Sequence, residues 1–224
     1  MPTPLRKQEV IGGSIYGLVQ FLLLPDIALT LHNIFLIPLW ILQVAVFGIN
    51  FVCTILIFRH FLLFSCKDAF SAPIKTAGFT VLGLVLYYLA HFSVTALILY
   101  LRPDFSNLND AGISSLAVDG GIWIAVGTVL LVPVAEECLF RGLLFRGVYD
   151  RSPVWAWILS ACGFSAVHIL SYVGIYDGIA LLLAFVQYLP AGLCLAWAYA
   201  RSNTIFAPIV IHAAINYVGI QQMR

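Results

Sequence analysis

Charged side chains are scarce in this chain: only 9% of its 224 residues are Asp, Glu, Lys or Arg, whereas a soluble domain carries about 25%. Hydrophobic residues make up 62% of the sequence, and the mean hydropathy is +1.01. This composition excludes an ordinary soluble domain and indicates an integral membrane protein. The net charge is only +1 and no basic face is evident, so we expect no nucleic acid partner.

Paired cysteines are also missing. None of the five cysteines forms a CxxC pair, which argues against a disulfide framework and against a thiolate zinc site. They are read as small buried hydrophobic residues: Cys53, Cys66, Cys138, Cys162 and Cys194. The chain also lacks an HExxH zinc helix, an internal repeat and any loop long enough for a soluble domain. The activity is therefore expected to lie in the membrane-spanning part itself.

Long apolar runs, by contrast, occupy most of the chain. A membrane-spanning helix needs about 20 predominantly apolar residues. Such runs predict seven spans, at residues 11–31, 34–58, 77–101, 121–145, 154–172, 179–200 and 204–221. Pro133 lies inside the fourth and is expected to kink or split it, so an eighth short helix is the alternative. The predicted fold class is all-α, a polytopic transmembrane helical bundle of seven to eight spans.

The charges between the spans predict an orientation. Arg6 and Lys7 precede the first span, and the apolar run after them lacks the small-residue cleavage pattern of a signal peptide, so it is read as a retained span. Further basic residues fall on the same side when seven spans alternate: Arg59, Lys67, Lys75, Arg146, Arg151 and Arg201. By the positive-inside rule the N-terminus is cytoplasmic. The 102–120 loop would then be external, and the expected location is the plasma membrane.

Polar residues recur inside three of the late spans. The fourth contains Glu136 and Glu137 followed by Arg141, which is one helical turn after Glu137 and able to pair with it. The fifth contains Phe164 and His168, and the last contains His212 and Asn216, each pair on one helix face because its members are four residues apart. Ionisable residues at membrane depth are expensive, and they are functional candidates for that reason.

These residue types suit hydrolysis. A glutamate such as Glu136 can take a proton from water as general base, assisted by an imidazole. An imidazole and an amide N–H, as in His212 and Asn216, can donate hydrogen bonds to the oxyanion of a tetrahedral intermediate. Alternatively, Glu136, His168 and His212 could hold a divalent metal such as zinc and leave one position for water. The sequence does not choose between a metal-bound water and a directly activated one.

The three motifs together, EExxxR, FxxxH and HxxxN in this order on successive late spans, resemble the CAAX-protease and bacteriocin-processing (CPBP, or Abi) family of intramembrane proteases. The resemblance covers residues 121–221, read as the catalytic core of a single transmembrane domain whose residues 1–110 supply the N-terminal spans. It implies that Glu136 activates water with His168 assisting, and that His212 and Asn216 stabilise the oxyanion. It places Glu137, Arg141 and Phe164 in supporting positions.

The leading hypothesis is an intramembrane endopeptidase that hydrolyses a peptide bond with a glutamate-activated water in a membrane-embedded cavity. Its partners would be membrane lipid and a peptide or membrane-protein substrate. One alternative is a bacteriocin self-immunity or scaffold protein that acts by binding without catalysis. Another is a transporter that uses the Glu, His and Arg side chains as a proton relay, although the inverted repeat typical of such proteins is not evident.

Overall fold

The computed structural model describes residues 4–222, and nearly all of them are helical. Within these residues, β structure is limited to an isolated bridge between Val173 and Tyr176. The elements in chain order are α1 (Lys7–Leu18), η1 (Val19–Leu23), α2 (Leu24–Phe35), α3 (Leu39–Ile57), α4 (Arg59–Ser71), α5 (Pro73–Leu101), α6 (Leu108–Val126), η2 (Gly127–Leu131), α7 (Val132–Glu137), η3 (Cys138–Arg146), α8 (Gly147–Tyr149), α9 (Pro153–Leu170), α10 (Gly178–Ser202) and α11 (Phe206–Gln222). The elements η1, η2 and η3 are π-helical segments set within longer helices. The predicted all-α fold class is confirmed.

Within residues 4–222, six helices are long and apolar enough to cross a membrane: Lys7–Phe35, Leu39–Ile57, Pro73–Leu101, Leu108–Tyr149, Pro153–Leu170 and Gly178–Ser202. They correspond to the first six predicted spans. The seventh prediction, at 204–221, coincides with α11, whose 17 residues make it shorter than any of the six. The protein is therefore an integral, multi-pass helical membrane protein.

The fourth of these helices is broken about a third of the way along its length. Gly121 has φ 45° and ψ −121° inside the 42-residue run Leu108–Tyr149, a left-handed conformation that glycine adopts most readily. The break lies where the fourth span was predicted to begin. The preceding residues, however, are helical from Leu108 onward, so the expectation of a loop over 102–120 was wrong. The reason is local: Asn107 caps this helix by accepting a hydrogen bond from the Asp110 amide at 3.0 Å, and hydropathy does not register a cap.

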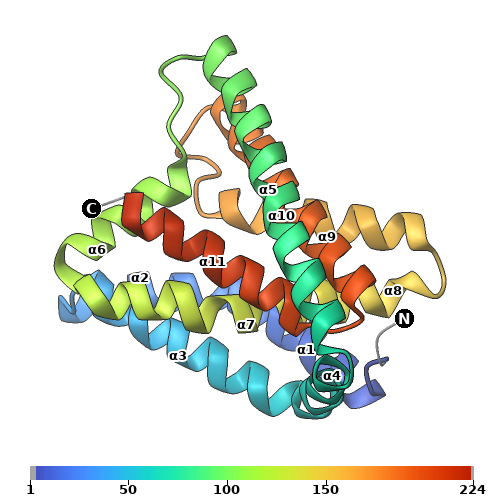
Figure 1. Cartoon of the computed structure of the whole chain (residues 1–224). Helices are drawn as coiled ribbons and strands as arrows, with labels where there is room; N and C mark the ends of the chain where they lie inside the picture. The colour runs from blue at the N-terminus through green and yellow to red at the C-terminus, as the bar shows by residue number, and fades with distance from the viewer. Residues whose placement is uncertain (1–3, 223–224) are drawn as a thin grey trace.

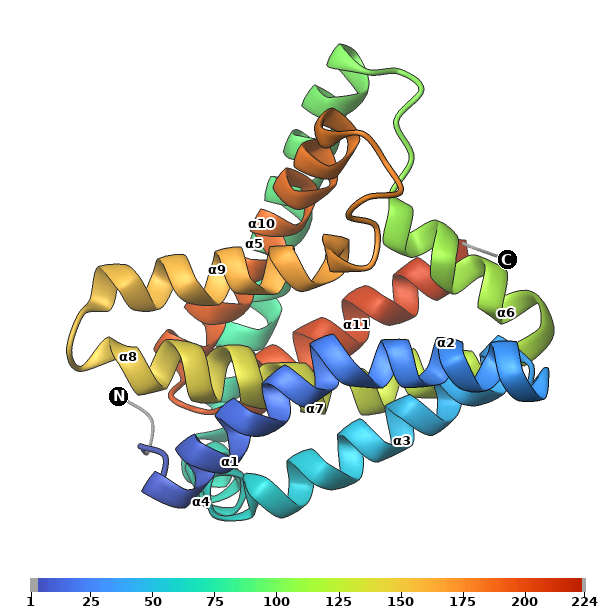
Figure 2. The same cartoon turned by 180° about the vertical axis from the view of Figure 1, so that it is seen from behind.

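Two long helices, α5 and α10, lie side by side and cross the other helices steeply (Figures 1 and 2). α10 also packs against α9 and α11. The contact with α9 is close because a Cβ atom on Gly192 would lie only 2.8 Å from the backbone of Ala161. Only glycine fits there without a shift of backbone, so this residue sets the distance between the two helices that carry one side of the site.

The short helix α4 joins the N-terminal helices to the C-terminal ones. The buried carboxylate of Glu9 on α1 accepts a hydrogen bond from the backbone amide of Phe61 at 2.8 Å. Ser65 lies 3.1 Å from the Thr204 hydroxyl and accepts from the amide of Ile205, just before α11. Polar groups that would be costly in lipid are thus satisfied against one another, and α4 links both halves of the chain.

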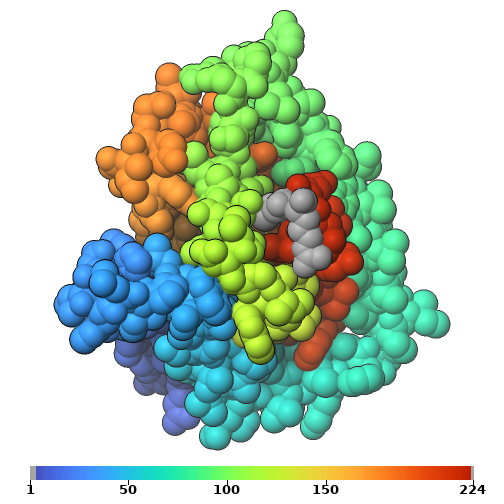
Figure 3. Space-filling model, turned by 90° about the vertical axis from the view of Figure 1, so that its left-hand side faces the viewer, coloured from blue at the N-terminus to red at the C-terminus, as the bar shows by residue number. Residues whose placement is uncertain are grey.

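Apolar side chains cover the outside of the molecule, as the membrane requires. Large hydrophobic residues such as Ile34, Phe35 and Ile74 are more than 60% exposed. Polar groups such as Glu137 and Arg141 are instead fully buried. On the face shown in Figure 3, the blue surface of α2, the yellow-green surface of α6 and the orange surface of the segment after α9 come together.

Candidate active site

A π-helical turn and a proline precede the two glutamates. In η2 the amide of Val132 donates to the carbonyl of Gly127, five residues earlier. The next hydrogen bond with this five-residue spacing would join the N–H of residue 133 to the carbonyl of Thr128, but Pro133 has no N–H. Asn216 on α11 fills the gap, because its Nδ2 donates to the Thr128 carbonyl at 2.8 Å. The expected distortion at Pro133 is therefore a π turn that fixes Asn216, and the helix continues through it.

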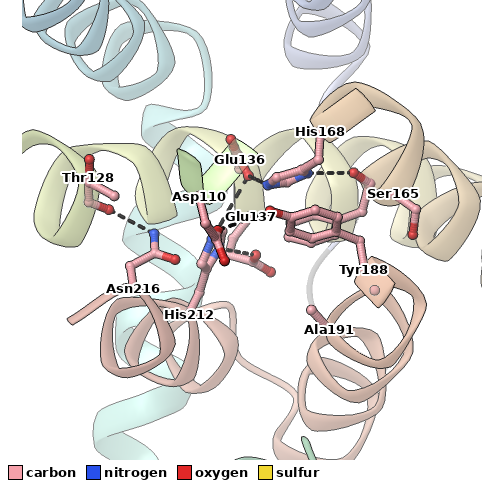
Figure 4. A network of polar contacts seen from close by, with 12 residues as sticks. Asp110, Thr128, Glu136, Glu137, Ser165, His168, Tyr188, Ala191, His212 and Asn216 are labelled. Atoms are coloured by element: carbon pink, nitrogen blue, oxygen red, sulfur yellow. Dashed lines mark hydrogen bonds and ion pairs between the residues drawn. The ribbon is translucent and has the colours of Figure 1, made fainter. Parts of the chain in front are cut away.

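The adjacent glutamates do different things. Glu137 is fully buried, and its Oε1 accepts from Arg141 Nη1 and lies against His212 Nδ1, each at 2.9 Å. Glu136 Oε2 is buried too but has no hydrogen-bond partner among the described residues. It lies 4.0 Å from Nε2 of His168 and 4.0 Å from Nε2 of His212, and Figure 4 shows it between the two rings. Glu137 is thus held by two partners through its Oε1, although its Oε2 also lacks a hydrogen-bond partner among the described residues. Glu136 Oε2 instead faces both imidazoles and is left for a ligand.

Arg141 connects the first motif to its surroundings. Its Nη2 donates to the backbone carbonyls of Ala191 at 3.4 Å and Gly192 at 3.2 Å on α10. Its guanidinium also lies over the ring of Phe164, 4.6 Å from the centroid, which is a cation–π contact. A buried guanidinium needs such partners. Arg141 therefore fixes Glu137 and Phe164 relative to α10.

His168 is held on three sides. Its Nδ1 lies 2.8 Å from the Phe164 carbonyl. Its ring contacts Phe164 on one side, at 4.6 Å between centroids, and stacks on Tyr188 on the other, at 4.2 Å. The Tyr188 hydroxyl donates in turn to Asn107 Oδ1 at 3.2 Å and lies 3.4 Å from Asp110 Oδ1. Figure 4 shows Tyr188 beside His168. The start of α6 thereby reaches the site through Tyr188.

The hydrogen bonds indicate the state of both imidazoles. A carbonyl oxygen and a carboxylate oxygen only accept, so Nδ1 of His168 and Nδ1 of His212 carry protons. Each Nε2 then faces Glu136 and can accept a hydrogen bond when the ring is neutral. With a second proton the ring would donate through this atom instead. The site thus offers acceptors and donors around one point.

Cavities lie on both sides of the histidines. One of about 180 Å³ is lined by Glu136, His168, His212 and Asn216 together. Another of about 140 Å³ extends from the two histidines toward Tyr88, His91 and the start of α6. The four residues predicted from the sequence as catalytic therefore share one chamber, and Glu137, Arg141 and Phe164 lie directly behind it.

A divalent metal would require Glu136, His168 and His212 to lie close enough to bind one ion. Among the described residues, no group of three His, Cys, Asp or Glu side chains is gathered closely enough to hold one. The separations of 4.0 Å between Glu136 Oε2 and the two Nε2 atoms exceed the roughly 3.4 Å expected between tetrahedral ligands about 2.1 Å from zinc. The steps derived below therefore use the side chains of the chain alone.

Sequence reasoning missed the groups that orient the predicted residues. Tyr188 and Asn107 match none of the three motifs, and Thr128 takes part through its backbone carbonyl, which no side-chain pattern reveals. A signal existed for Tyr188: it follows Gln187 directly, and two polar residues in a row are unusual inside an apolar span. Gln187 does belong to the same network, because its Oε1 accepts from Asn107 Nδ2 at 2.7 Å.

Parts of the chain are similar in sequence to known proteins. Residues 118–218 match the model of a family described as type II CAAX prenyl endopeptidase Rce1-like. "UPF0177 protein YxdF" of Lactococcus lactis subsp. lactis (strain IL1403) is 27% identical over 145 residues, which are 63% of this chain and 74% of that protein. "Putative membrane peptidase YdiL" of Bacillus subtilis (strain 168) is 30% identical over 94 residues, 41% of this chain and 34% of that protein. The chain thus matches about a third of the length of the Bacillus relative, and no solved structure matches it.

Fold and site define a polytopic helical membrane protein with a buried glutamate–histidine centre. The comparisons add the family. They support the resemblance carried by the three motifs to the CPBP family, with the match over residues 118–218, which hold the site. At the level of that family, they support a membrane protease.

Proposed function

We propose that this protein is an intramembrane endopeptidase in which Glu136 activates the water that attacks a peptide bond. The supporting observation is the position of Glu136 Oε2, buried, without a hydrogen-bond partner among the described residues and 4.0 Å from both Nε2 atoms. A carboxylate in that position can accept a proton from a water that the imidazoles orient. His168 Nε2 accepts a hydrogen bond from the same water.

The reaction needs a place for the oxyanion. The water oxygen bonds to the carbonyl carbon, one of its protons passes to Glu136, and negative charge develops on the carbonyl oxygen. The second N–H of the Asn216 amide stabilises that charge, since its first N–H is used by the Thr128 carbonyl. Protonated His212, supported by Glu137, supplies a further N–H. When the C–N bond breaks, the proton on Glu136 passes to the leaving nitrogen.

The substrate is proposed to be a peptide or a membrane protein that reaches the site within the membrane. We further propose the plasma membrane as the location, with the N-terminus in the cytoplasm, on the basis of the basic residues between the spans. A role in bacteriocin immunity by binding alone is the competing proposal, because the same chamber could hold a peptide without cleaving it.

The test is a cleavage assay with purified full-length protein in detergent. Membrane-peptide libraries and prenylated CAAX peptides are incubated with the wild type, Glu136→Gln and a matched control, Asp119→Asn, which changes an exposed carboxylate. We expect Glu136→Gln to lower kcat by about 10²–10⁴-fold and the control to cleave normally. Samples with and without chelator decide whether a metal takes part. Cleavage at an unchanged rate by a folded Glu136→Gln protein would reject the proposal.

A further inference from the structure

A larger cavity adjoins the reaction chamber at Glu136 and has no role in the mechanism above. It has a volume of about 380 Å³ and is lined by Lys7–Phe35, α3, α6, α7 and the segment after α9. Glu136 lines both this cavity and the reaction chamber. Its volume lies within the range of ligand pockets, roughly 300–1,000 Å³. A molecule in this cavity would therefore lie next to the catalytic carboxylate.

The lining of this cavity is mostly apolar, with Phe21, Leu29 and Phe47 among its hydrophobic residues. Glu136 is the one charged residue of the lining, and Ser171 and Tyr172 contribute hydroxyls. Four side-chain amides come from three different elements: Gln20 on η1, Gln43 and Asn50 on α3, and Asn109 on α6. Gln43 and Asn109 also line the reaction chamber, so the amides continue from one cavity into the other.

Gln20 is the most informative of these amides. Its side chain is only 6% exposed, and its Oε1 is buried without a hydrogen-bond partner among residues 4–222. A polar atom left unpaired in a water-free environment is costly. Asn50, which lines the same cavity, shows the contrast, because its Oδ1 accepts from the Tyr16 hydroxyl at 2.6 Å. Gln20 is thus available for a ligand.

The backbone at Gln20 repeats the arrangement that precedes Glu136. Gln20 lies in the π turn η1, in which the amide of Leu24 donates to the carbonyl of Val19. Pro25 follows and lacks the N–H that would next pair with the Gln20 carbonyl. The corresponding carbonyl in η2 is that of Thr128, and a side-chain amide binds it. Isolated π turns occur frequently at functional sites.

These features fit an unwound peptide. A membrane-inserted helix must lose backbone hydrogen bonds before one of its peptide bonds can be attacked, and inside lipid each freed N–H and C=O is costly. A side-chain amide offers both a donor and an acceptor, so it can pair with a freed peptide group. We propose, on the basis of the proposed peptidase function, that this cavity binds the unwound, uncharged part of an apolar membrane segment. Its backbone pairs with Gln20, Gln43 and Asn109.

The surface outside the cavity suits access from the lipid. The helices η1, α2 and α3 expose large apolar side chains, among them Leu22, Ile27 and Ile41. The surfaces of α2, α6 and the segment after α9, which contribute to the cavity wall, meet on one face of the molecule (Figure 3). A segment arriving there keeps its apolar side chains in contact with apolar surface while its backbone reaches the amides.

The test measures binding apart from cleavage. The Glu136→Gln protein is reconstituted in nanodiscs, and the probe is a dye-labelled transmembrane peptide of Leu and Ala with a central Gly-Gly pair that weakens its helix. Two comparison peptides have Ala-Ala or Lys-Lys at the centre. Anisotropy gives the Kd, and we expect the Gly-Gly peptide to bind most tightly and the Lys-Lys peptide most weakly.

The same titration is repeated with amide substitutions. Gln20→Leu and Gln43→Leu combined should raise the Kd of the Gly-Gly peptide about tenfold or more, as expected for the loss of two hydrogen bonds. Gln20→Leu alone should also raise the unfolding midpoint, because it removes an unpaired buried oxygen. That second measurement separates lost binding from misfolding. Gln8→Leu, an exposed amide on α1, is the matched control and should change neither quantity.

Each outcome has one meaning. Unchanged binding by the double variant, or failure of the Gly-Gly peptide to bind the Glu136→Gln protein, would overturn the inference. Tighter binding by the double variant would overturn it as well, and would indicate a purely apolar occupant such as a lipid chain. None of these results bears on the cleavage assay, in which the proposed function fails if Glu136→Gln cleaves like the wild type.

Discussion

The two halves of the chain bury their helices to very different extents. In the most apolar stretch of Gly178–Ser202, 39% of the residues are buried within the protein, whereas in Lys7–Phe35 the share is 6%. The C-terminal helices surround Glu137, Arg141 and their partners and form a packed core. The N-terminal helices face lipid on most sides and add one wall to a cavity. The difference teaches that the late helices fix the geometry of the proposed catalytic site, while in our proposal the early helices form the cavity that a substrate enters.

The largest expected effect is on the C-terminal core. Glu137→Ala leaves Arg141 buried without its carboxylate, and breaking a buried ion pair in this way costs about 3–5 kcal/mol. Thermal unfolding in detergent measures this loss. Glu136→Ala is the matched control, and its stability should be unchanged or raised, because Glu136 Oε2 has no hydrogen-bond partner in residues 4–222. Equal destabilisation by both substitutions would contradict the division of roles between the two glutamates.

A pair of glycines gives the next comparison. Gly192→Ala places a Cβ atom 2.8 Å from the Ala161 backbone, and such overpacking costs about 1–3 kcal/mol. Gly48→Ala on α3 meets no atom within 4 Å and should be neutral or stabilising, because alanine favours a helix. Unfolding midpoints of both variants test this. An unchanged unfolding midpoint in the Gly192→Ala variant would show that the packing of the C-terminal helices adjusts as easily as that of the N-terminal helices.

Tyr188 tests whether the start of α6 influences catalysis. Tyr188→Phe retains the stack on His168 but loses the hydroxyl contact with Asn107. Because one hydrogen bond contributes about 0.5–1.5 kcal/mol, kcat should fall roughly 2–10-fold while KM and the unfolding midpoint change little. Tyr188→Leu, which also removes the stack, should have a larger effect on kcat. If both variants match the wild type, Tyr188 does not position His168.

The smallest effect concerns the helix starts outside the membrane. Asp177 caps α10 by accepting from the amides of Ala180 and Ile179, and these bonds lower the pKa of its carboxyl below the usual 3.8. The stabilisation is therefore complete above that usual value and is lost as the pH falls through the lowered one. In the Asp177→Asn variant, the free energy of unfolding should depend less on pH in this acid range. The start of α3, which follows Pro38 and has no side-chain cap, should contribute no such pH dependence of stability.

Sequence patterns predicted the spans and the four residues around the chamber because both depend on local signals. Apolar length predicts a span, and a polar residue such as Glu136 or His168 is conspicuous within one. The start of α6 was missed for the same reason: its cap residue Asn107 is a local signal of another kind, which a search for apolar runs does not detect.

Other features depend on tertiary contact and could not be predicted. The stack of Tyr188 on His168 joins two helices, and the bond from Asn216 reaches a backbone carbonyl on a third. The separate roles of Glu136 and Glu137 follow from which side of the helix His212 approaches. Residue types indicated the chemistry, but only packing decides which atom meets which.

The π turns have a consequence for comparing this chain with its relatives. A π turn absorbs one residue inserted into an α-helix, so the side chains after it keep the directions that they have in a regular helix, whereas an insertion that is not absorbed would rotate them by about 100°. Deleting a single residue between Gly127 and Leu131 should therefore convert the π turn to regular α-helix and leave Glu136 in the chamber. A relative without the turn would align with a one-residue gap ahead of the paired glutamates, and counting spacings along its sequence would assign the base to the wrong carboxylate.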